Sequence, residues 1–193
     1  FLNGEKMSDL TITHAGNAVT RSADSPGSSI STARRRIIRI TPTLDTAAYG
    51  QGDVVFNSVE IPNAVLGDGG CSKLIAMFIV NQVTTTVDID FIFSENTGTL
   101  GTVNATANIA DSALEAMNVT GYLKLDSSEA NTGFLDNSRI QRVYNNSNTE
   151  DVNPILLQAA PGSTSVYIAA IQTSSGAITF QADSMDLVFH IEY

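Results

Sequence analysis

The pattern of hydrophobic and polar positions changes at Arg34. From there to Tyr193, short segments rich in Val, Ile or Phe are bounded by Gly, Pro, Asn or Asp, which is typical of β-strands and turns. About ten strands are expected: 34–41, 53–61, 73–81, 86–93, 119–125, 138–144, 154–159, 164–173, 177–181 and 184–193. Many short strands without intervening helices predict an all-β fold, an antiparallel jelly-roll-like β-sandwich.

Two segments show which side of a strand faces the core. In the last one the apolar positions alternate with polar ones, and the same holds for the segment that begins at Val87. The residues expected to be buried are Met185, Leu187, Phe189, Ile191 and Tyr193, and Val87, Ile89, Phe91 and Phe93. Alternation of period two predicts one buried and one solvated face. The segment 74–80 is apolar throughout, which predicts a strand covered on both faces by a second sheet or a neighbouring subunit.

One short helix is expected, over 110–117. Asp111 or Ser112 is positioned to cap its first turn, and Glu115 to complete a capping box. Leu114 and Met117, three residues apart, are expected to face the core.

The first 33 residues have a different composition. Residues 9–32 are rich in Ser, Thr, Gly and Ala, and such a segment cannot build a core by itself. We therefore expect an extended, flexible N-terminal arm over 1–33, ordered by a partner, and one sandwich domain over 34–193. Met7-Ser8 reads as a natural start, and the first ten residues lack the basic and apolar regions of a secretory signal.

Composition limits the class of protein further. Of the 193 residues, 42% are hydrophobic and 16% are charged, which argues against disorder of the whole chain. Each apolar segment is too short to cross a bilayer, so no membrane association is expected. Cys71 is the sole cysteine. It is expected to be a small buried side chain rather than a nucleophile or a metal ligand.

Charge is distributed unevenly along the sequence. Up to Ile40 there are six Lys or Arg against three Asp or Glu, whereas the remaining residues hold four against seventeen. Five of the ten basic residues are Arg21, Arg34, Arg35, Arg36 and Arg39. A basic leader joined to an acidic body predicts attachment to another surface through the leader.

No pattern of catalytic residues competes with that hypothesis. His14 and His190 have no Cys, Asp or Glu at metal-ligand spacing, and no nucleophile elbow, phosphate-binding loop or dinucleotide fingerprint occurs. Gly67 to Gly70 reads as a hairpin turn. Asp88 and Asp90 share one face of a strand and could hold calcium with a third acid, but a solvated face is favoured because calcium needs six or more oxygens. The chain is expected to be no enzyme and to hold no cofactor or metal.

Several strand and turn motifs resemble a group of tailed-phage virion proteins. They are Thr41-Pro42-Thr43-Leu44, Ala48-Tyr49-Gly50-Gln51-Gly52-Asp53, Pro62-Asn63-Ala64, the strand 87–93, the turn at 111–113, Gly121-Tyr122-Leu123, Asn153-Pro154-Ile155, and Ser165-Val166-Tyr167-Ile168. The resemblance extends from about Ile40 to Tyr193. The resemblance implies a head-associated virion component, and it does not include the arginine cluster.

The arginine cluster leaves three hypotheses open. It could neutralise nucleic acid, dock on an acidic protein surface, or protect an exposed edge strand from aggregation. Nucleic acid is disfavoured because the acidic body would be repelled by phosphate. Protein docking is favoured, with Arg21, Arg34, Arg35, Arg36 and Arg39 as the residues that contact the capsid.

The sequence therefore predicts a capsid decoration, or cement, protein on the virion surface, made in the host cytoplasm. Its expected partner is the major capsid protein, and a homotrimer on a symmetry axis is a further hypothesis. The alternative is a tail or head-fibre module that binds a host surface glycan, although the chain has no Trp and only five Tyr to form aromatic platforms. A third class, a hydrolase, would require a pair of acids that sequence spacing does not reveal.

Overall fold

A computed structural model describes residues 10–14, 17–21, 34–82, 86–131, 138–143 and 155–193. The chain divides into two compact units, Phe1–Ala33 and Arg34–Tyr193. In the first unit, β1 (Leu10–His14) pairs antiparallel with β2 (Asn17–Arg21), and Leu10 lies opposite Arg21. The sequence did not predict this hairpin. Other residues of the predicted arm lie outside the described part of the chain.

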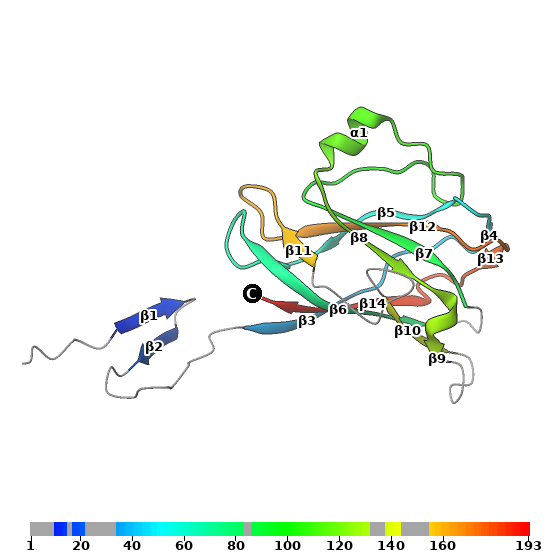
Figure 1. Ribbon diagram of the computed structural model, residues 1–193. Helices are drawn as coiled ribbons and strands as arrows, with labels where there is room; N and C mark the ends of the chain where they lie inside the picture. Colours follow the sequence, from blue (N-terminus) through cyan, green and yellow to red (C-terminus); the bar gives the residue numbers. More distant parts are fainter. Residues whose placement is uncertain (1–9, 15–16, 22–33, 83–85, 132–137, 144–154) are drawn as a thin grey trace, which may run out of the picture. The chain divides into compact units, whose positions relative to one another are not determined.

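The second unit is an antiparallel β-sandwich (Figure 1), which confirms the predicted fold class. One sheet has the order β3-β14-β6-β10-β9, and β11 also pairs with β6. The other has the order β5-β12-β7-β8. A small third sheet pairs β4 with β13. Every predicted strand is present.

The bounds of the strands differ from the predicted ones by a few residues at most. The larger sheet contains β3 (Arg35–Ile40), β6 (Cys71–Asn81), β9 (Ala130–Asn131), β10 (Arg139–Val143), β11 (Ile155–Gln158) and β14 (Met185–Glu192). The four-stranded sheet contains β5 (Val54–Ile61), β7 (Ile89–Ser94), β8 (Val119–Leu125) and β12 (Val166–Gln172). The small sheet contains β4 (Ala48–Tyr49) and β13 (Ile178–Thr179).

The core lies between the two large sheets and follows the predicted alternation. In β14 the side chains of Met185, Leu187, Phe189 and Ile191 are fully buried, whereas Tyr193, which was also expected to be buried, is only partly so. The β7 side chains of Ile89, Phe91 and Phe93 are buried as well, as is Val87 just before this strand. The rings of Phe93 and Phe189 meet edge to face with centroids 6.3 Å apart, so the two sheets interlock at this pair.

Cys71 is exposed, and the prediction that it is buried is wrong. It is the first residue of β6, where the next residue, Ser72, points inward. The Ser72 hydroxyl donates a hydrogen bond to the Ala64 carbonyl oxygen at 2.6 Å. Because side chains alternate along a strand, this contact turns Cys71 outward.

The prediction of a hairpin at Gly67 to Gly70 is also wrong. The Gly70 N–H donates to the Gly67 carbonyl at 3.1 Å, so these residues do form a turn. The turn lies in the connection from β5 to β6, however, and these strands belong to different sheets. It therefore carries the chain across the end of the sandwich.

The helix α1 (Asp111–Ala116) is present, but its details differ from the prediction. Its N-cap is Ala110, and no side chain caps it. Met117 is buried as predicted, whereas Leu114 is exposed. One turn of 3-10 helix follows β8, at Ser127–Glu129. No helix in the described ranges has the length and hydropathy needed to cross a membrane.

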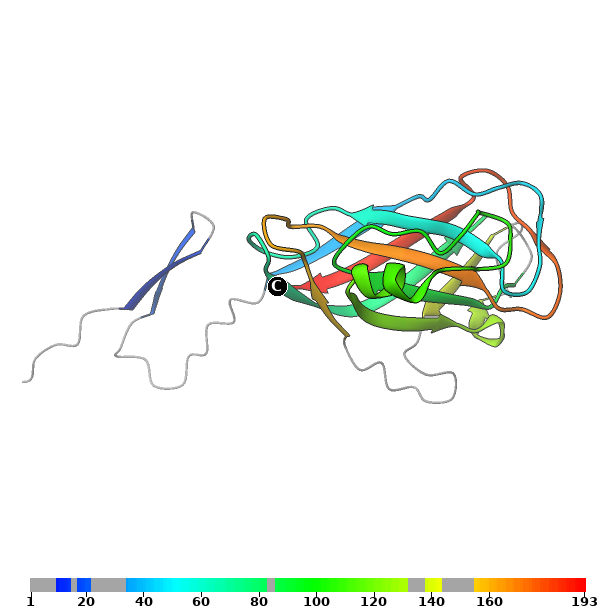
Figure 2. The same ribbon diagram turned by 90° about the horizontal axis from the view of Figure 1, so that it is seen from above.

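The helix and its flanking loops cover the outer face of the four-stranded sheet (Figures 1 and 2). A second small core forms there from Val54, Leu100, Met117 and Ala169. The chain thus covers the part of the four-stranded sheet around β5 and β12 on both sides, whereas Tyr122 and Lys124 of β8 remain exposed.

Candidate partner-binding surface

The outer face of the larger sheet has no such cover from the described residues. Its centre is an apolar stripe that crosses four strands: Ile37, Ala76, Phe78, Val80, Ile140 and Val188. Ile37 is 63% exposed and Ile140 is 41% exposed, Phe78 and Val80 are half-buried, and Val188 is buried. We call this set the apolar stripe; His190 interrupts it between Ile37 and Ala76. Partly exposed apolar residues gathered on one face of a folded domain commonly mark an interaction surface.

The stripe bears on the prediction that β6 is covered on both faces. The inward side chains of Leu74, Met77 and Ile79 are buried in the core. The outward side chains of Ala76, Phe78 and Val80 are only partly buried, and the ring of Phe78 contacts that of His190 at a centroid distance of 5.3 Å. The second covering layer is therefore not supplied by the described part of this chain.

Charged side chains border the stripe. Arg35 Nε lies 3.0 Å from Glu192 Oε2, and Arg39 Nη1 lies 3.1 Å from Asp186 Oδ2. Both arginine side chains remain largely exposed, at 72% and 56%. Such surface ion pairs contribute little stability, roughly 0–1 kcal/mol.

The net charge of this face contrasts with that of the whole body. Among the described strands, the outward charged side chains are Arg35, Arg39, Lys73 and Arg142 against Asp186 and Glu192. Residues 34–193 as a whole hold eight basic against seventeen acidic residues. The outer face is therefore a positive region on an acidic protein, which favours an acidic partner.

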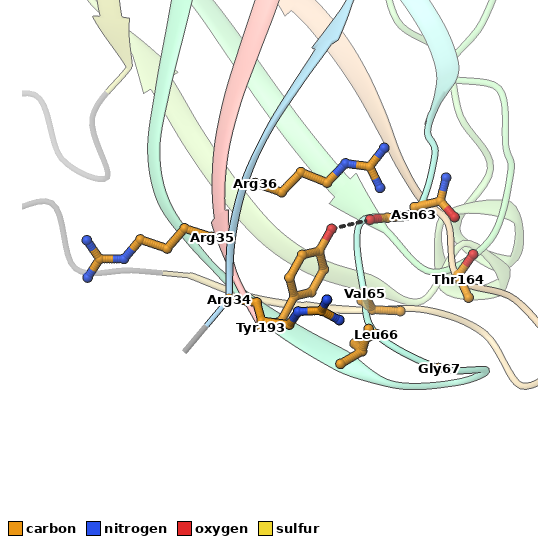
Figure 3. A pocket seen from close by; sticks show the side chains of 9 residues that line it. All are labelled: Arg34, Arg35, Arg36, Asn63, Val65, Leu66, Gly67, Thr164 and Tyr193. Carbon is orange, nitrogen blue, oxygen red and sulfur yellow. Dashed lines mark hydrogen bonds between the residues drawn. The ribbon is translucent and has the colours of Figure 1, made fainter. Parts of the chain in front are cut away.

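The alternation of β3 sends the other two arginines to the opposite side. Arg34 and Arg36 line a cleft of about 390 Å³ at one end of the sandwich, and Arg35 lies at its border. The other lining residues are Asn63, Val65, Leu66, Gly67, Thr164 and Tyr193. Figure 3 shows Arg36 extending towards Asn63, while Arg35 extends away from the cleft. Neither Arg34 nor Arg36 forms an ion pair with any residue that the structure describes.

Tyr193 is the fixed wall of this cleft. Its hydroxyl donates to the Asn63 carbonyl oxygen at 2.6 Å, drawn as a dashed line in Figure 3. Its backbone N–H donates to the Arg34 carbonyl at 2.8 Å. The end of the chain thereby ties the start of β3 to the loop that follows β5.

The five arginines predicted to contact a partner therefore do not form one cluster. Arg39 lies on the outer face, Arg34 and Arg36 line the cleft, and Arg35 borders both. Arg21 is the last residue of β2, in the other unit. The apolar stripe and the cleft residues Asn63 and Tyr193 were not predicted as parts of the surface. The period of two in Arg35-Ile37-Arg39 was the sequence signal that could have separated the two sides.

The acidic pair considered for calcium already has protein partners. Asp88 Oδ1 accepts from the Ser127 N–H at 2.6 Å, and Asp90 Oδ1 lies 4.0 Å from Lys124 Nζ. Asp126 lines the same cleft of about 280 Å³, and hydrogen bonds from Ser128 lower its pKa. Within the described ranges, no three His, Cys, Asp or Glu side chains gather as metal ligands.

Comparison with protein-family models found no matching family, and comparisons with curated proteins and with solved structures found no match either. What the chain does must therefore be inferred from its own residues and geometry.

Proposed function

We propose that this protein is a non-enzymatic structural component of a tailed-phage virion that decorates and stabilises the capsid. It docks on the major capsid protein through the outer face of the larger sheet, and the N-terminal arm contributes a second attachment. The observation that carries the proposal is the apolar stripe bordered by basic side chains, on a sheet face that the described chain leaves uncovered.

The binding energy in this proposal comes from surface burial. Apolar area removed from water contributes about 25 cal/mol per Å², and a stable interface buries about 800 Å² on each partner. The stripe supplies an apolar centre, and Arg35 and Arg39 supply a polar border. This is the usual arrangement of a protein interface.

Charge makes the partner a protein rather than nucleic acid. A polyanion approaching this body would meet an excess of nine acidic residues over residues 34–193. A folded protein can present a few acidic side chains to the positive face without that long-range repulsion. The major capsid protein is therefore the proposed partner.

The order of the strands supports the virion part of the proposal. The orders β3-β14-β6-β10 and β5-β12-β7-β8 place successive strands alternately in the two sheets, except for the neighbours β7 and β8. Eight strands in two such sheets are the plan of a jelly roll, a fold found in viral capsid domains and in lectins. Fold alone does not fix function, so the outer face carries the argument.

The test introduces a negative charge at Ile37, the most exposed residue of the stripe. Ile37→Glu should weaken binding to capsids that lack the protein by at least about tenfold, because a carboxylate would have to be buried in the interface. Leu114→Glu is the matched control, since Leu114 is exposed at 38% on α1, which covers the other sheet. Cosedimentation with purified capsids measures binding, and thermal melting checks folding.

Equal binding by the Ile37→Glu variant and the wild type would refute docking through this face. Equal loss in both variants would show that the outer face has no special role.

A second candidate function, glycan binding by a fibre module, is favoured by one observation. The Tyr122 ring is 39% exposed beside the cleft that contains Asp88, Asp90 and Lys124. Sugars bind to exposed aromatic rings. However, Lys124 Nζ already lies 5.7 Å from the centroid of this ring. Saturable binding on a glycan array that is lost in Tyr122→Ala would favour this function over capsid decoration.

A further inference from the structure

We propose that the cleft around Arg34 and Arg36 is a specific binding site for a carboxylate group carried by an acidic segment of a protein. The proposal does not depend on docking through the outer face, because the cleft lies on the other side of β3.

The first argument is the charge of the cleft. Two guanidinium groups line it, and neither is neutralised by a described acidic residue. The neighbouring Arg35 and Arg39 show the alternative, since each is paired with a carboxylate of β14. A guanidinium group presents a planar fork of N–H donors that matches the two oxygens of a carboxylate. The two cleft arginines therefore have unused capacity for this group.

The second argument is that the site is held in place before a ligand arrives. The backbone of β3 is fixed by pairing with β14, where Arg36 lies opposite Ile191 and Arg35 opposite Glu192. Tyr193 adds the hydrogen bonds to Arg34 and Asn63 that join β3 to the opposite loop. Binding then requires little ordering of the backbone, which lowers its entropic cost.

The third argument concerns the form of the ligand. Val65 and Leu66 form an apolar wall beside the arginines, and Asn63 and Thr164 add polar groups. A side chain that ends in a carboxylate and has a short aliphatic stem matches this mixture. The volume of about 390 Å³ is within the range of small-ligand sites. Inorganic phosphate shares the oxyanion chemistry but has no stem to contact Val65 and Leu66.

The experiment uses the full chain and a capped hexaglutamate peptide as the probe. Binding is measured by calorimetry at about physiological ionic strength, where exposed charges are screened beyond roughly 8 Å. Capped hexaglutamine and inorganic phosphate are the comparison ligands. Hexaglutamate should bind, hexaglutamine should not, and phosphate should be at least about tenfold weaker.

The variants separate the cleft from general positive charge. Arg34→Gln combined with Arg36→Gln should lower affinity for hexaglutamate at least about tenfold, which corresponds to about 1.4 kcal/mol. Arg39→Gln combined with Lys73→Gln removes the same charge from the outer face, at residues that do not line the cleft, and should change the affinity less than about twofold. Arg36→Lys keeps the charge but loses the fork, so it should weaken binding several-fold.

Three results would overturn the proposal. Equal losses in the two double variants would show that hexaglutamate responds to net charge only. Phosphate binding as tight as hexaglutamate would make the cleft a site for small oxyanions. Absence of hexaglutamate binding to the wild type would exclude the site. None of these results would affect docking by the outer face, which the Ile37→Glu variant tests separately.

Discussion

Tyr49 is a buried residue whose polar group is satisfied entirely by the chain. Its hydroxyl oxygen accepts from the Asp45 N–H at 2.7 Å, and its ring meets Phe180 edge to face with centroids 5.5 Å apart. The side chain has no exposed surface. The hydroxyl also donates to the Val55 carbonyl oxygen at 3.4 Å, so its removal would take a hydrogen-bond partner from both groups.

Tyr49→Phe should therefore destabilise the sandwich by about 0.5–1.5 kcal/mol, the usual net contribution of a hydrogen bond. Urea denaturation measures the change. Tyr167→Phe serves as the control, since Tyr167 is half-buried in β12 and should change the free energy of unfolding by less than about 0.5 kcal/mol. A Tyr49→Phe variant as stable as the wild type would contradict the role assigned to this hydrogen bond.

Tyr49 also affects how the stability of the sandwich changes at alkaline pH. Burial raises the pKa of Tyr49 above its ordinary value of 10.0. Below pH 10 the phenol is neutral in both states, so its contribution to stability is fully present. As pH rises towards the native pKa, only the unfolded state loses the proton, and stability falls by up to about 1.4 kcal/mol per pH unit. The stability difference between wild type and Tyr49→Phe should therefore shrink above pH 10 in urea titrations.

At this scale the sequence predicted burial well where alternation was strict, as in β14 and β7. It failed at Cys71, because residue type was given more weight than position, and Cys71 shares its face with Lys73. The arginine run was treated as one cluster for the same reason. Strand geometry places Arg35 and Arg36 on opposite faces whatever their charge.

The turn between β5 and β6 leaves no room for a side chain at Gly70. A Cβ atom on Gly70 would lie 2.4 Å from the Leu66 carbonyl oxygen. Main-chain atoms of a tight turn cannot move aside as a flexible side chain can. The turn therefore requires glycine at this position, and the cleft residues Val65 and Leu66 depend on it.

Gly70→Ala should cost roughly 1–3 kcal/mol or more, as overpacking does elsewhere. It should also weaken hexaglutamate binding, because the loop that carries Leu66 must shift. Gly176→Ala is the matched control: a Cβ there meets nothing within 4 Å, and the change in stability should stay below about 0.5 kcal/mol. Thermal melting of both variants measures the change in stability. A Gly70→Ala variant with an unchanged melting temperature would show that the turn can accommodate the added Cβ atom.

Among the elements, the longer strands were predictable, whereas the two-residue strands β4 and β9 were not. β8 has the predicted bounds, since branched and aromatic residues flanked by turn residues are a local signal. β4 and β9, with two residues each, exist only through their partners β13 and β10. The cap of α1 was misplaced because two neighbouring polar residues offered equal alternatives to Ala110. Which sheet a strand joins depends on contacts distant in sequence, so the cross-sheet connections could not be inferred.

For the whole molecule, the informative feature is the unequal cover of the two sheets. The chain covers part of the four-stranded sheet with α1 and its loops, and its described residues leave the larger sheet open. The apolar sequence of β6 predicted that both faces of this strand are buried. The sequence could not show what buries its outer face, since burial by a neighbouring subunit and burial by a second sheet predict the same run of apolar residues.

A homotrimer remains a prediction that the open face makes testable. If the stripe is buried between subunits, sedimentation at high concentration should give a trimer, and Ile37→Glu should convert it to a monomer. If the stripe instead meets the capsid, the purified protein should keep its oligomeric state in this variant and lose only capsid binding. A wild-type monomer both in solution and on particles would exclude the trimer.

The arm is tested by removing residues 8–33. The units Phe1–Ala33 and Arg34–Tyr193 are each compact, and every strand of the two large sheets lies in the second. The truncated protein should therefore melt within a few degrees of the full chain, because the described core residues of the sandwich lie between Ile38 and Ile191. Its binding to capsids should fall by a factor of about 10² or more, since two linked attachments reinforce each other through effective concentration. Unchanged capsid binding would remove the arm from the mechanism, and an unfolded truncation would show that the arm belongs to the core.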